Sequence, residues 1–114
     1  GLIYCSLGYF KESFNYFNEA LNFSNFLNFQ SGKATSYLNL GSLYGSVGKY
    51  DEALENLSKA QELFKNELKN NNKHSKVLLN IGICYLEKKD YTNAYTSFQK
   101  SFELSTDDQF KREI

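Results

Sequence analysis

The stretch that decides the fold is NLGSLYGSVGKYDEALENLSKA, residues 39–60. Its apolar residues have helical spacing, yet it contains glycines at positions 41 and 45. A glycine in a helix interior costs about 1 kcal/mol relative to alanine. Each of these glycines therefore needs a reason, and the rest of the sequence supplies one for Gly41 but not for Gly45.

The pattern around Gly41 occurs three times in the 114 residues of the chain. Gly1, Gly41 and Gly82 coincide, at separations of 40 and 41 residues. Each glycine is followed by a tyrosine and then by two small residues. These positions are Tyr4, Tyr44 and Tyr85, then Ser13, Ala53 and Ala94, then Ala20, Ala60 and Ser101. A register shared by so many positions indicates an internal repeat.

Each repeat unit contains two stripes of apolar residues at steps of three and four, which is typical of one face of a helix. In the second unit the stripes cover residues 37–47 and 50–64. The pairs that separate the two stripes are Gly8-Tyr9, Gly48-Lys49 and Lys89-Asp90. Each unit is therefore predicted to be a helical hairpin with a tight turn at these pairs.

The hairpin explains why a glycine is present in the helix at position 41. We expect Gly41 to face the small residues Ala53 and Ala60 of the second helix, so that the two backbones approach closely. Gly1 and Gly82 are expected to do the same in their own units. The close packing of the two helices then offsets the low helix propensity of glycine.

The repeat register predicts helices at residues 1–7, 10–29, 33–47, 50–69, 74–88 and 91–104. The run Asn70 to Asn72 is expected to end the fourth of these helices. Thr106 with Asp107 and Asp108 has the form of an N-cap followed by an acidic first turn. A further helix is therefore predicted to start at residues 106–114.

With this register, the sequence resembles the tetratricopeptide repeat family, whose signature is a bulky residue, Leu-Gly, Tyr, Ala, an aromatic residue and Ala. The second unit matches with Tyr37, Leu40, Gly41, Tyr44, Ala53, Leu57 and Ala60, and the third with Leu78, Ile81, Gly82, Tyr85, Ala94, Phe98 and Ser101. The resemblance covers essentially the whole chain. It implies an all-α fold, a right-handed solenoid of helical hairpins.

Two features depart from the family pattern. The closing proline of the repeat is absent, because the chain contains no proline. The units are also longer than the usual period of about 34 residues. In length they are similar to the arrays of cell-polarity G-protein-regulator scaffolds and, slightly longer still, of kinesin light chains. The extra residues are expected to extend the second helix of each unit.

We expect one array across residues 1–114. Repeat 1 covers residues 1–30 and lacks half of its first helix, repeat 2 covers residues 31–72, and repeat 3 covers residues 73–105. The chain has no methionine and its first unit begins at the repeat glycine. It is therefore expected to be a fragment of a longer array.

Charge and hydropathy exclude several classes of function. The chain has 13 basic and 13 acidic residues and a formal net charge of +0. This balance gives no basic surface for nucleic acid or for a membrane. The longest apolar stretch, residues 77–86, is too short to span a bilayer, and no signal peptide opens the chain. We expect a cytoplasmic protein, with a cytoskeletal or ciliary location as the more specific alternative.

Candidates for catalysis or metal binding are few. Cys5 and Cys84 lie in separate predicted helices without a ligand spacing, so buried thiols are favoured over a disulfide or metal pair. His74 is expected to be a solvated surface residue. The acidic pairs at residues 51–52 and 107–108 sit at predicted helix starts, where they stabilise the helix dipole. We therefore expect no enzymatic activity, no cofactor and no metal.

The family resemblance implies a scaffold for protein–protein interaction, in which the first helix of each hairpin lines a concave groove. In several members an asparagine just before the Leu-Gly pair bonds the backbone of a bound peptide. Asn39 and Asn80 match that position. An amide can hold a peptide backbone because it both donates and accepts hydrogen bonds. The alternative is that both asparagines are simply solvated.

Other residues are expected on or near the same groove. They are Thr35, Leu38, Ser42, Ser46, Lys76, Leu79, Ile83 and Glu87. The family's clamp for C-terminal carboxylates needs several lysines and asparagines. Only Lys76 and the two asparagines contribute here, so the sequence does not favour such a clamp.

An aromatic run with Tyr16, Phe23, Phe26 and Phe29 has two interpretations. It packs against Tyr37 and the neighbouring hairpin, or it forms an exposed ridge that docks another subunit.

Three functions follow from these observations. The first, which we predict, is a scaffold that binds a peptide or a partner helix in its groove. The second is a structural subunit held in a large cytoskeletal or ciliary assembly by its outer faces. The third is a regulatory array joined to an enzyme elsewhere in a longer chain.

Overall fold

Five α-helices and one short π-helical turn make up the described part of the chain. The computed structural model describes the backbone of residues 2–113 and the side chains of residues 8–105. The elements are α1 (Leu2–Leu27), α2 (Gln30–Ser46), α3 (Tyr50–Glu62), the π-turn η1 (Leu63–Glu67), α4 (Asn71–Glu87) and α5 (Tyr91–Glu113). The described backbone contains no strand. The all-α prediction is confirmed.

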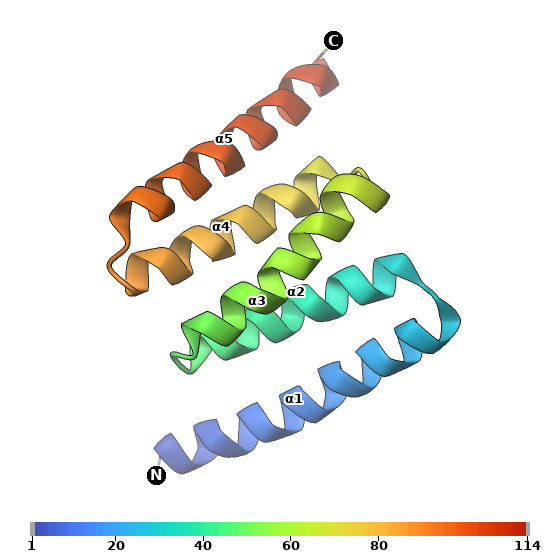
Figure 1. The fold of residues 1–114 in the computed structure, drawn as a ribbon, viewed down its shortest axis with the longest axis vertical. Helices are drawn as coiled ribbons and strands as arrows, with labels where there is room; N and C mark the ends of the chain where they lie inside the picture. The colour runs from blue at the N-terminus through green and yellow to red at the C-terminus, as the bar shows by residue number, and fades with distance from the viewer. Residues whose placement is uncertain (1, 114) are drawn as a thin grey trace.

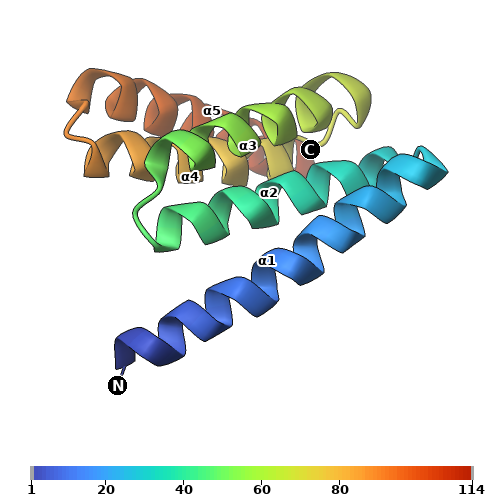
Figure 2. The ribbon, with the colours of Figure 1, turned by 60° about the horizontal axis from the view of Figure 1, so that its bottom comes forward.

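The helices stack in chain order along the long dimension of the molecule, from α1 at one end to α5 at the other (Figure 1). The molecule measures 50 × 38 × 22 Å, and its radius of gyration is 15.1 Å. A compact domain of this length has a radius of gyration of about 13 Å. In Figure 2, α2 and α4 lie in one layer and α3 and α5 in the next. These features make the chain a helical-repeat solenoid.

The turns inside the two complete hairpins lie where the sequence predicts them. Gly48, between α2 and α3, has a φ of +83°, and Lys89, between α4 and α5, has a φ of +65°. Both are left-handed backbone conformations, which glycine adopts without strain. The two residues are 41 positions apart in the sequence. The hairpin repeat is therefore present in the backbone as well as in the side chains.

The predicted turn at Gly8-Tyr9 is wrong. Both residues lie inside α1, which runs unbroken for 26 residues. A helix of seven residues before such a turn is too short to be stable without packing, whereas continuing α1 adds one hydrogen bond for each residue. α1 instead packs on α2 as a single helix, with the rings of Phe10 and Phe14 each 6.0 Å from the ring of Tyr44.

The predicted new helix at residue 106 is also wrong, because α5 continues to Glu113. Residues 106–113 contain neither glycine nor proline, so nothing interrupts the backbone hydrogen bonds. The side chains of Thr106, Asp107 and Asp108, on which the predicted cap rested, lie outside the described set.

The second helix of repeat 2 is extended, as the long unit predicts, but its end is a π-turn. α3 passes into η1, where the amide of Leu68 donates to the carbonyl of Leu63 at 2.9 Å. The break before α4 lies at Asn70, whose side chain accepts a hydrogen bond from the amide of Lys73 at 3.0 Å. Asn70 therefore caps α4, whereas Asn71 and Asn72, which were expected in the break, are the first residues of that helix.

The core lies where α2, α3, η1 and α4 meet. Its buried members are Ala34, Ala53, Leu57, Ala60, Phe64, Val77, Ile81 and Cys84. The repeat residues Tyr44 and Tyr85 pack against its edge and are partly buried. Ala53, Leu57 and Ala60 are fully buried, as their places in the repeat pattern predict.

Gly41 and Gly82 do allow a close approach, and Gly41 meets the backbone of the predicted partner Ala53, but in each unit the nearest side chain is the bulky residue of the second helix. A Cβ on Gly41 would lie 2.6 Å from Cγ of Leu57 and 3.2 Å from the carbonyl oxygen of Ala53. A Cβ on Gly82 would lie 2.6 Å from Cε1 of Phe98. The bulky residue of the second helix therefore lies on the glycine backbone, and the small residues flank it. Gly1 and the side chain of Tyr4 lie outside the described residues.

A hydroxyl pair joins α4 to α5 where repeat 2 has two alanines. Ser75 and Ser101 stand one unit after Ala34 and Ala60. The hydroxyl of Ser75 bonds the carbonyl of Ser101 at 2.9 Å, and the hydroxyl of Ser101 donates to the carbonyl of Ser75 at 2.8 Å. Both buried hydroxyls are thereby satisfied, so the polar pair is tolerated between the helices.

Two glycine substitutions test the packing. Gly41→Leu forces a large side chain against Leu57, and we expect it to lower the free energy of unfolding by about 1–3 kcal/mol. Gly45→Ala is the control, because a Cβ there would lie 3.7 Å from Sγ of Cys84, an ordinary contact. It should raise the free energy of unfolding by about 0.5–1 kcal/mol through helix propensity. Urea unfolding followed by circular dichroism measures both, and equal midpoints for Gly41→Leu and wild type would contradict the packing.

Candidate functional site

The predicted groove residues form one stripe on each of two neighbouring helices. On α2 they are Thr35, Leu38, Asn39, Ser42 and Ser46, and on α4 they are Lys76, Leu79, Asn80, Ile83 and Glu87. In both sets the members follow the three- and four-residue periodicity of a helix, with one adjacent pair in each (Leu38-Asn39 and Leu79-Asn80), which places the members of a set on one side of their helix. Because α2 and α4 lie in the same layer (Figure 2), the two stripes face a common surface.

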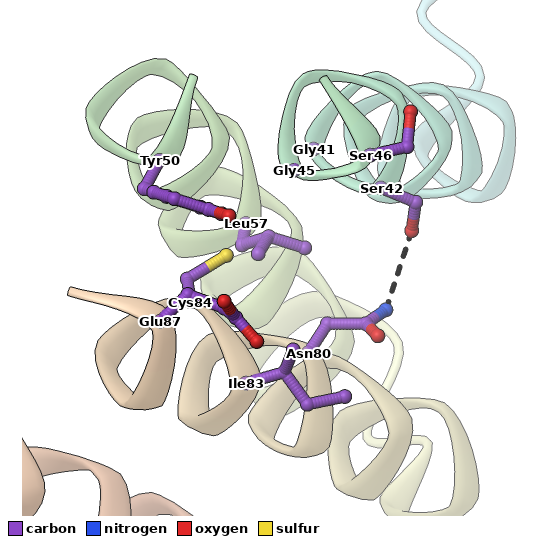
Figure 3. A pocket seen from close by; sticks show the side chains of 10 residues that line it. All are labelled: Gly41, Ser42, Gly45, Ser46, Tyr50, Leu57, Asn80, Ile83, Cys84 and Glu87. Atoms are coloured by element: carbon purple, nitrogen blue, oxygen red, sulfur yellow. Dashed lines mark hydrogen bonds between the residues drawn. The ribbon is translucent and has the colours of Figure 1, made fainter. Parts of the chain in front are cut away.

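A cavity of about 380 Å³ lies between these two helices. Its lining residues, drawn in Figure 3, are Gly41, Ser42, Gly45 and Ser46 of α2, Tyr50 and Leu57 of α3, and Asn80, Ile83, Cys84 and Glu87 of α4. Leu57 and Cys84 are buried and form an apolar floor. Ser42, Ile83 and Glu87 are exposed and form the rim.

One hydrogen bond crosses the cavity. The side-chain amide of Asn80 donates to the hydroxyl of Ser42 at 3.3 Å, as the dashed line in Figure 3 shows. The hydroxyl of Ser46, one turn further along α2, donates to the carbonyl of Leu43 at 2.7 Å. The rim therefore presents polar groups of both helices above the apolar floor.

Half of the predicted groove residues line this cavity. They are Ser42, Ser46, Asn80, Ile83 and Glu87. The other five lie outside it on the same two stripes: Thr35, Lys76 and Leu79 are exposed, and Leu38 and Asn39 are partly buried. The structure therefore brings Asn80 to the cavity and leaves Asn39 beyond its edge.

Sequence reasoning missed the floor of the cavity. Tyr50, Leu57 and Cys84 were expected only in the packing of the helices, yet they line the space as well. Gly45 was a signal for this cavity. No neighbouring atom would exclude a side chain at Gly45. Because glycine has no side chain, α2 leaves space for the cavity at this position.

Glu87 and a nearby ion pair determine the charge of the site. Of the described residues that line the cavity, Glu87 alone carries a charge. Lys88 follows it and donates a hydrogen bond to the carboxylate of Asp51, which raises the pKa of Lys88. Burial raises the pKa of the Cys84 thiol, against a smaller opposing effect of the Lys88 charge. The cavity is therefore weakly acidic at one end and otherwise neutral.

The aromatic run, which consists of three residues of α1 and of Phe29 at the N-cap of α2, is exposed. Phe26 is 86% exposed, and Tyr16, Phe23 and Phe29 are each more than half exposed. The interpretation in which these rings pack against Tyr37 is therefore wrong. Tyr37 instead lies under the ammonium group of Lys59, which is 5.4 Å from its ring centroid. We call Tyr16, Phe23 and Phe26 the aromatic ridge.

Of the cysteine and histidine side chains, one lies as predicted and one does not. Cys84 is a free, buried thiol, as predicted, and the side chain of Cys5 lies outside the described set. His74 is only 7% exposed, so the prediction of a solvated histidine is wrong. It lies in the first turn of α4 and lines a pocket together with side chains of η1 and α5. Among residues 8–105, no group of three or more His, Cys, Asp and Glu side chains could hold a metal ion.

The acidic residues at the start of α3, Asp51 and Glu52, lie in the first turn of that helix, as predicted. A search of the described helices for a membrane span finds none of sufficient length and apolar character.

Comparison with known proteins agrees with the geometry. Two family models match the chain, both described as tetratricopeptide repeat, one over residues 1–66 and the other over residues 75–108. The comparison with curated proteins gives no match. The first model alone covers more than half of the 114 residues. Repeats of this kind are non-enzymatic and mediate protein–protein interaction. The chain belongs to the tetratricopeptide repeat family.

Proposed function

We propose that this chain is a non-enzymatic scaffold that holds an extended segment of a partner protein in the groove between α2 and α4. The cavity carries the proposal, because the apolar floor of Leu57 and Cys84 lies below a polar rim that includes Ser42 and Asn80. Binding pockets typically combine an apolar lining with a few polar groups that orient the ligand.

Asn80 is suited to a peptide backbone. Its amide offers two donors and an acceptor, and its 3.3 Å bond to Ser42 is longer than the common range for hydrogen bonds. A backbone carbonyl of the partner can replace Ser42 with little loss of hydrogen-bond energy. Recognition of the backbone alone does not specify a sequence. Any preference for particular side chains of the ligand must therefore come from the apolar floor and from Glu87.

Glu87 supplies the preference for charge. It lies on the rim at the end of α4, and a carboxylate there favours a lysine or arginine in the bound segment. The floor favours an apolar side chain. We therefore expect ligands in which an apolar residue stands close to a basic one.

Selection from a displayed library of random peptides tests the groove. Peptides selected for binding to the full chain should bind Asn39→Ala/Asn80→Ala roughly 5- to 150-fold more weakly, because a peptide group loses its hydrogen bond in a partly dry site, which costs about 1–3 kcal/mol. Asn80→Ala alone should account for most of this loss, since Asn39 lies beyond the edge of the cavity. Isothermal titration with one selected peptide gives the affinities.

The matched control is Asn18→Ala, an identical change at an exposed position on α1, which should leave affinity unaltered. All variants should keep the melting temperature of the wild type within about 2 °C. Equal affinity of the wild type and the double variant for every selected peptide would rule out the groove as the binding surface.

A second candidate function is that of a structural subunit in a multi-subunit assembly, such as a cytoskeletal or ciliary complex. The aromatic ridge favours it, because an exposed apolar surface of this kind is typical of interaction sites. In that case Tyr16→Ser/Phe23→Ser/Phe26→Ser should abolish recovery of the partner in a pull-down, and Asn39→Ala/Asn80→Ala should not affect it.

Cys84 provides a further prediction, since its thiol lies on the floor of the groove. A raised pKa means less thiolate at a given pH, and the thiolate is the reactive form. In a Cys5→Ser background, we expect iodoacetamide at about pH 8.5, near the ordinary pKa of cysteine, to react more slowly with native Cys84 than with the urea-unfolded chain. A selected peptide should slow the reaction further. Equal native and unfolded rates would show that the thiol is not buried.

A further inference from the structure

A second pocket lies on the opposite side of α4 from the groove. It has a volume of about 250 Å³, and its polar lining consists of Gln61 of α3, Lys65 of η1, His74 of α4, and Lys100 and Glu103 of α5. His74 and the groove residue Ile83 are nine residues apart in one helix. That distance is two and a half turns, so the two side chains point to opposite sides. The pocket is separate from the proposed peptide site.

His74 lines this pocket and has an unmet hydrogen bond at a buried ring nitrogen. The residue is 93% buried, being 7% exposed, and its Nε2 atom is buried without a hydrogen-bond partner. It is the one such side-chain atom found among the described residues. Buried polar atoms in folded proteins are nearly always paired, so an unpaired one calls for an explanation. A ligand in the adjoining cavity that accepts a hydrogen bond supplies one.

The charges around His74 indicate the sign of that ligand. Burial, and then the positive charges of Lys65 and Lys100, lower the pKa of His74. Glu103 is the acidic residue of the lining, and Gln61 is neutral. Two lysines against one glutamate leave the pocket with an excess of positive charge. An anion would relieve the repulsion between the lysines and would favour the protonated imidazole.

The position of Lys65 follows from the extra length of the repeat unit. In η1 the chain takes a wider turn, and Phe64 is buried at 2% exposure as its anchor in the core. The next residue, Lys65, lines the pocket over the first turn of α4. π-helical turns are rare and are frequent at functional sites. The local structure that distinguishes this unit is therefore the one that places a cation beside His74.

We propose that this pocket binds a phosphate group, with Nε2–H of His74 and the ammonium groups of Lys65 and Lys100 as its hydrogen-bond donors. A cavity of about 250 Å³ has room for such a group, since one water molecule occupies about 30 Å³ in the liquid. With the imidazole protonated, the lining carries two excess positive charges and matches a dianion. The positive end of the α4 dipole, close to His74, adds to the attraction.

The sole histidine of the chain makes the test direct. The imidazole resonances in an NMR spectrum belong to His74 without further assignment. We expect the pKa of His74 in the free chain to lie below the ordinary value of about 6.5. Inorganic phosphate should raise it, and the shift should saturate with phosphate concentration. Sulfate, which remains a dianion across the titration, should act in the same way and should bind more tightly as the pH falls from about 7 to about 5.

Lysine variants distinguish specific phosphate binding in the pocket from a nonspecific effect of ionic strength. Lys65→Gln and Lys100→Gln should each weaken phosphate binding by roughly 10- to 100-fold, the effect of losing one charged hydrogen bond. Lys59→Gln is the matched control. It removes the same charge from α3 at a residue that faces Tyr37 and does not line the pocket, and the affinity should change by less than about twofold. Circular dichroism melts verify that each variant is folded.

Two further ligands identify the source of the anion. Phosphoserine that binds as tightly as inorganic phosphate shows that the pocket accepts an esterified group, and weaker binding assigns it to the free ion. Both results support a phosphate site. If acetate at the same ionic strength shifts the pKa of His74 as far as phosphate does, the proposal is overturned. It is likewise overturned if phosphate acts equally on the wild type, Lys65→Gln and Lys100→Gln.

Discussion

The rest of the structure depends on the contact between a glycine backbone in one helix and a bulky side chain in the next. Leu57 lies on Gly41, and Phe98 lies on Gly82. Because the same contact is made in both hairpins, α2 sits on α3 as α4 sits on α5. The two first helices consequently have the same rotation about their axes. This equivalence turns the matching stripes of α2 and α4 toward a common surface, where Ser42 of one stripe meets Asn80 of the other. A glycine that is unfavourable for its own helix is thus favourable for the array.

The sequence predicted what local signals determine and missed what depends on tertiary contacts. The turns at Gly48 and Lys89 and the break near Asn70 are local, and they lie where expected, although α4 begins at Asn71 and not at residue 74. The continuity of α1 through Gly8 was missed because a turn needs a packed helix on either side of it. The burial of His74 was missed because its surroundings, which include side chains of η1 and α5 in a shared pocket, are distant in sequence or irregular in form. In the groove, the face of each helix was predictable from spacing, whereas the floor was not.

α4 is the element in which these features converge. On one side it contributes Asn80, Ile83 and Glu87 to the groove, and on the other it contributes His74 to the pocket beside Lys65. The residues Val77 and Ile81 of α4 belong to the hydrophobic core and hold the helix in place between the groove and the pocket. The two surfaces differ in chemistry, because one is neutral to acidic above an apolar floor and the other has excess positive charge. One helix therefore supports two independent binding surfaces, and a change on one side leaves the other available as a control.

A double-mutant cycle between Gly41 and Leu57 tests the central packing claim most directly. Gly41→Ala, Leu57→Ala and the double variant are unfolded in urea, and the coupling between the two sites follows from the four free energies of unfolding. Because the added methyl group meets Leu57 itself, Gly41→Ala should destabilise the wild type and should cost at least about 1 kcal/mol less once Leu57 is alanine. Effects of the two substitutions that add to within about 0.5 kcal/mol would contradict the account.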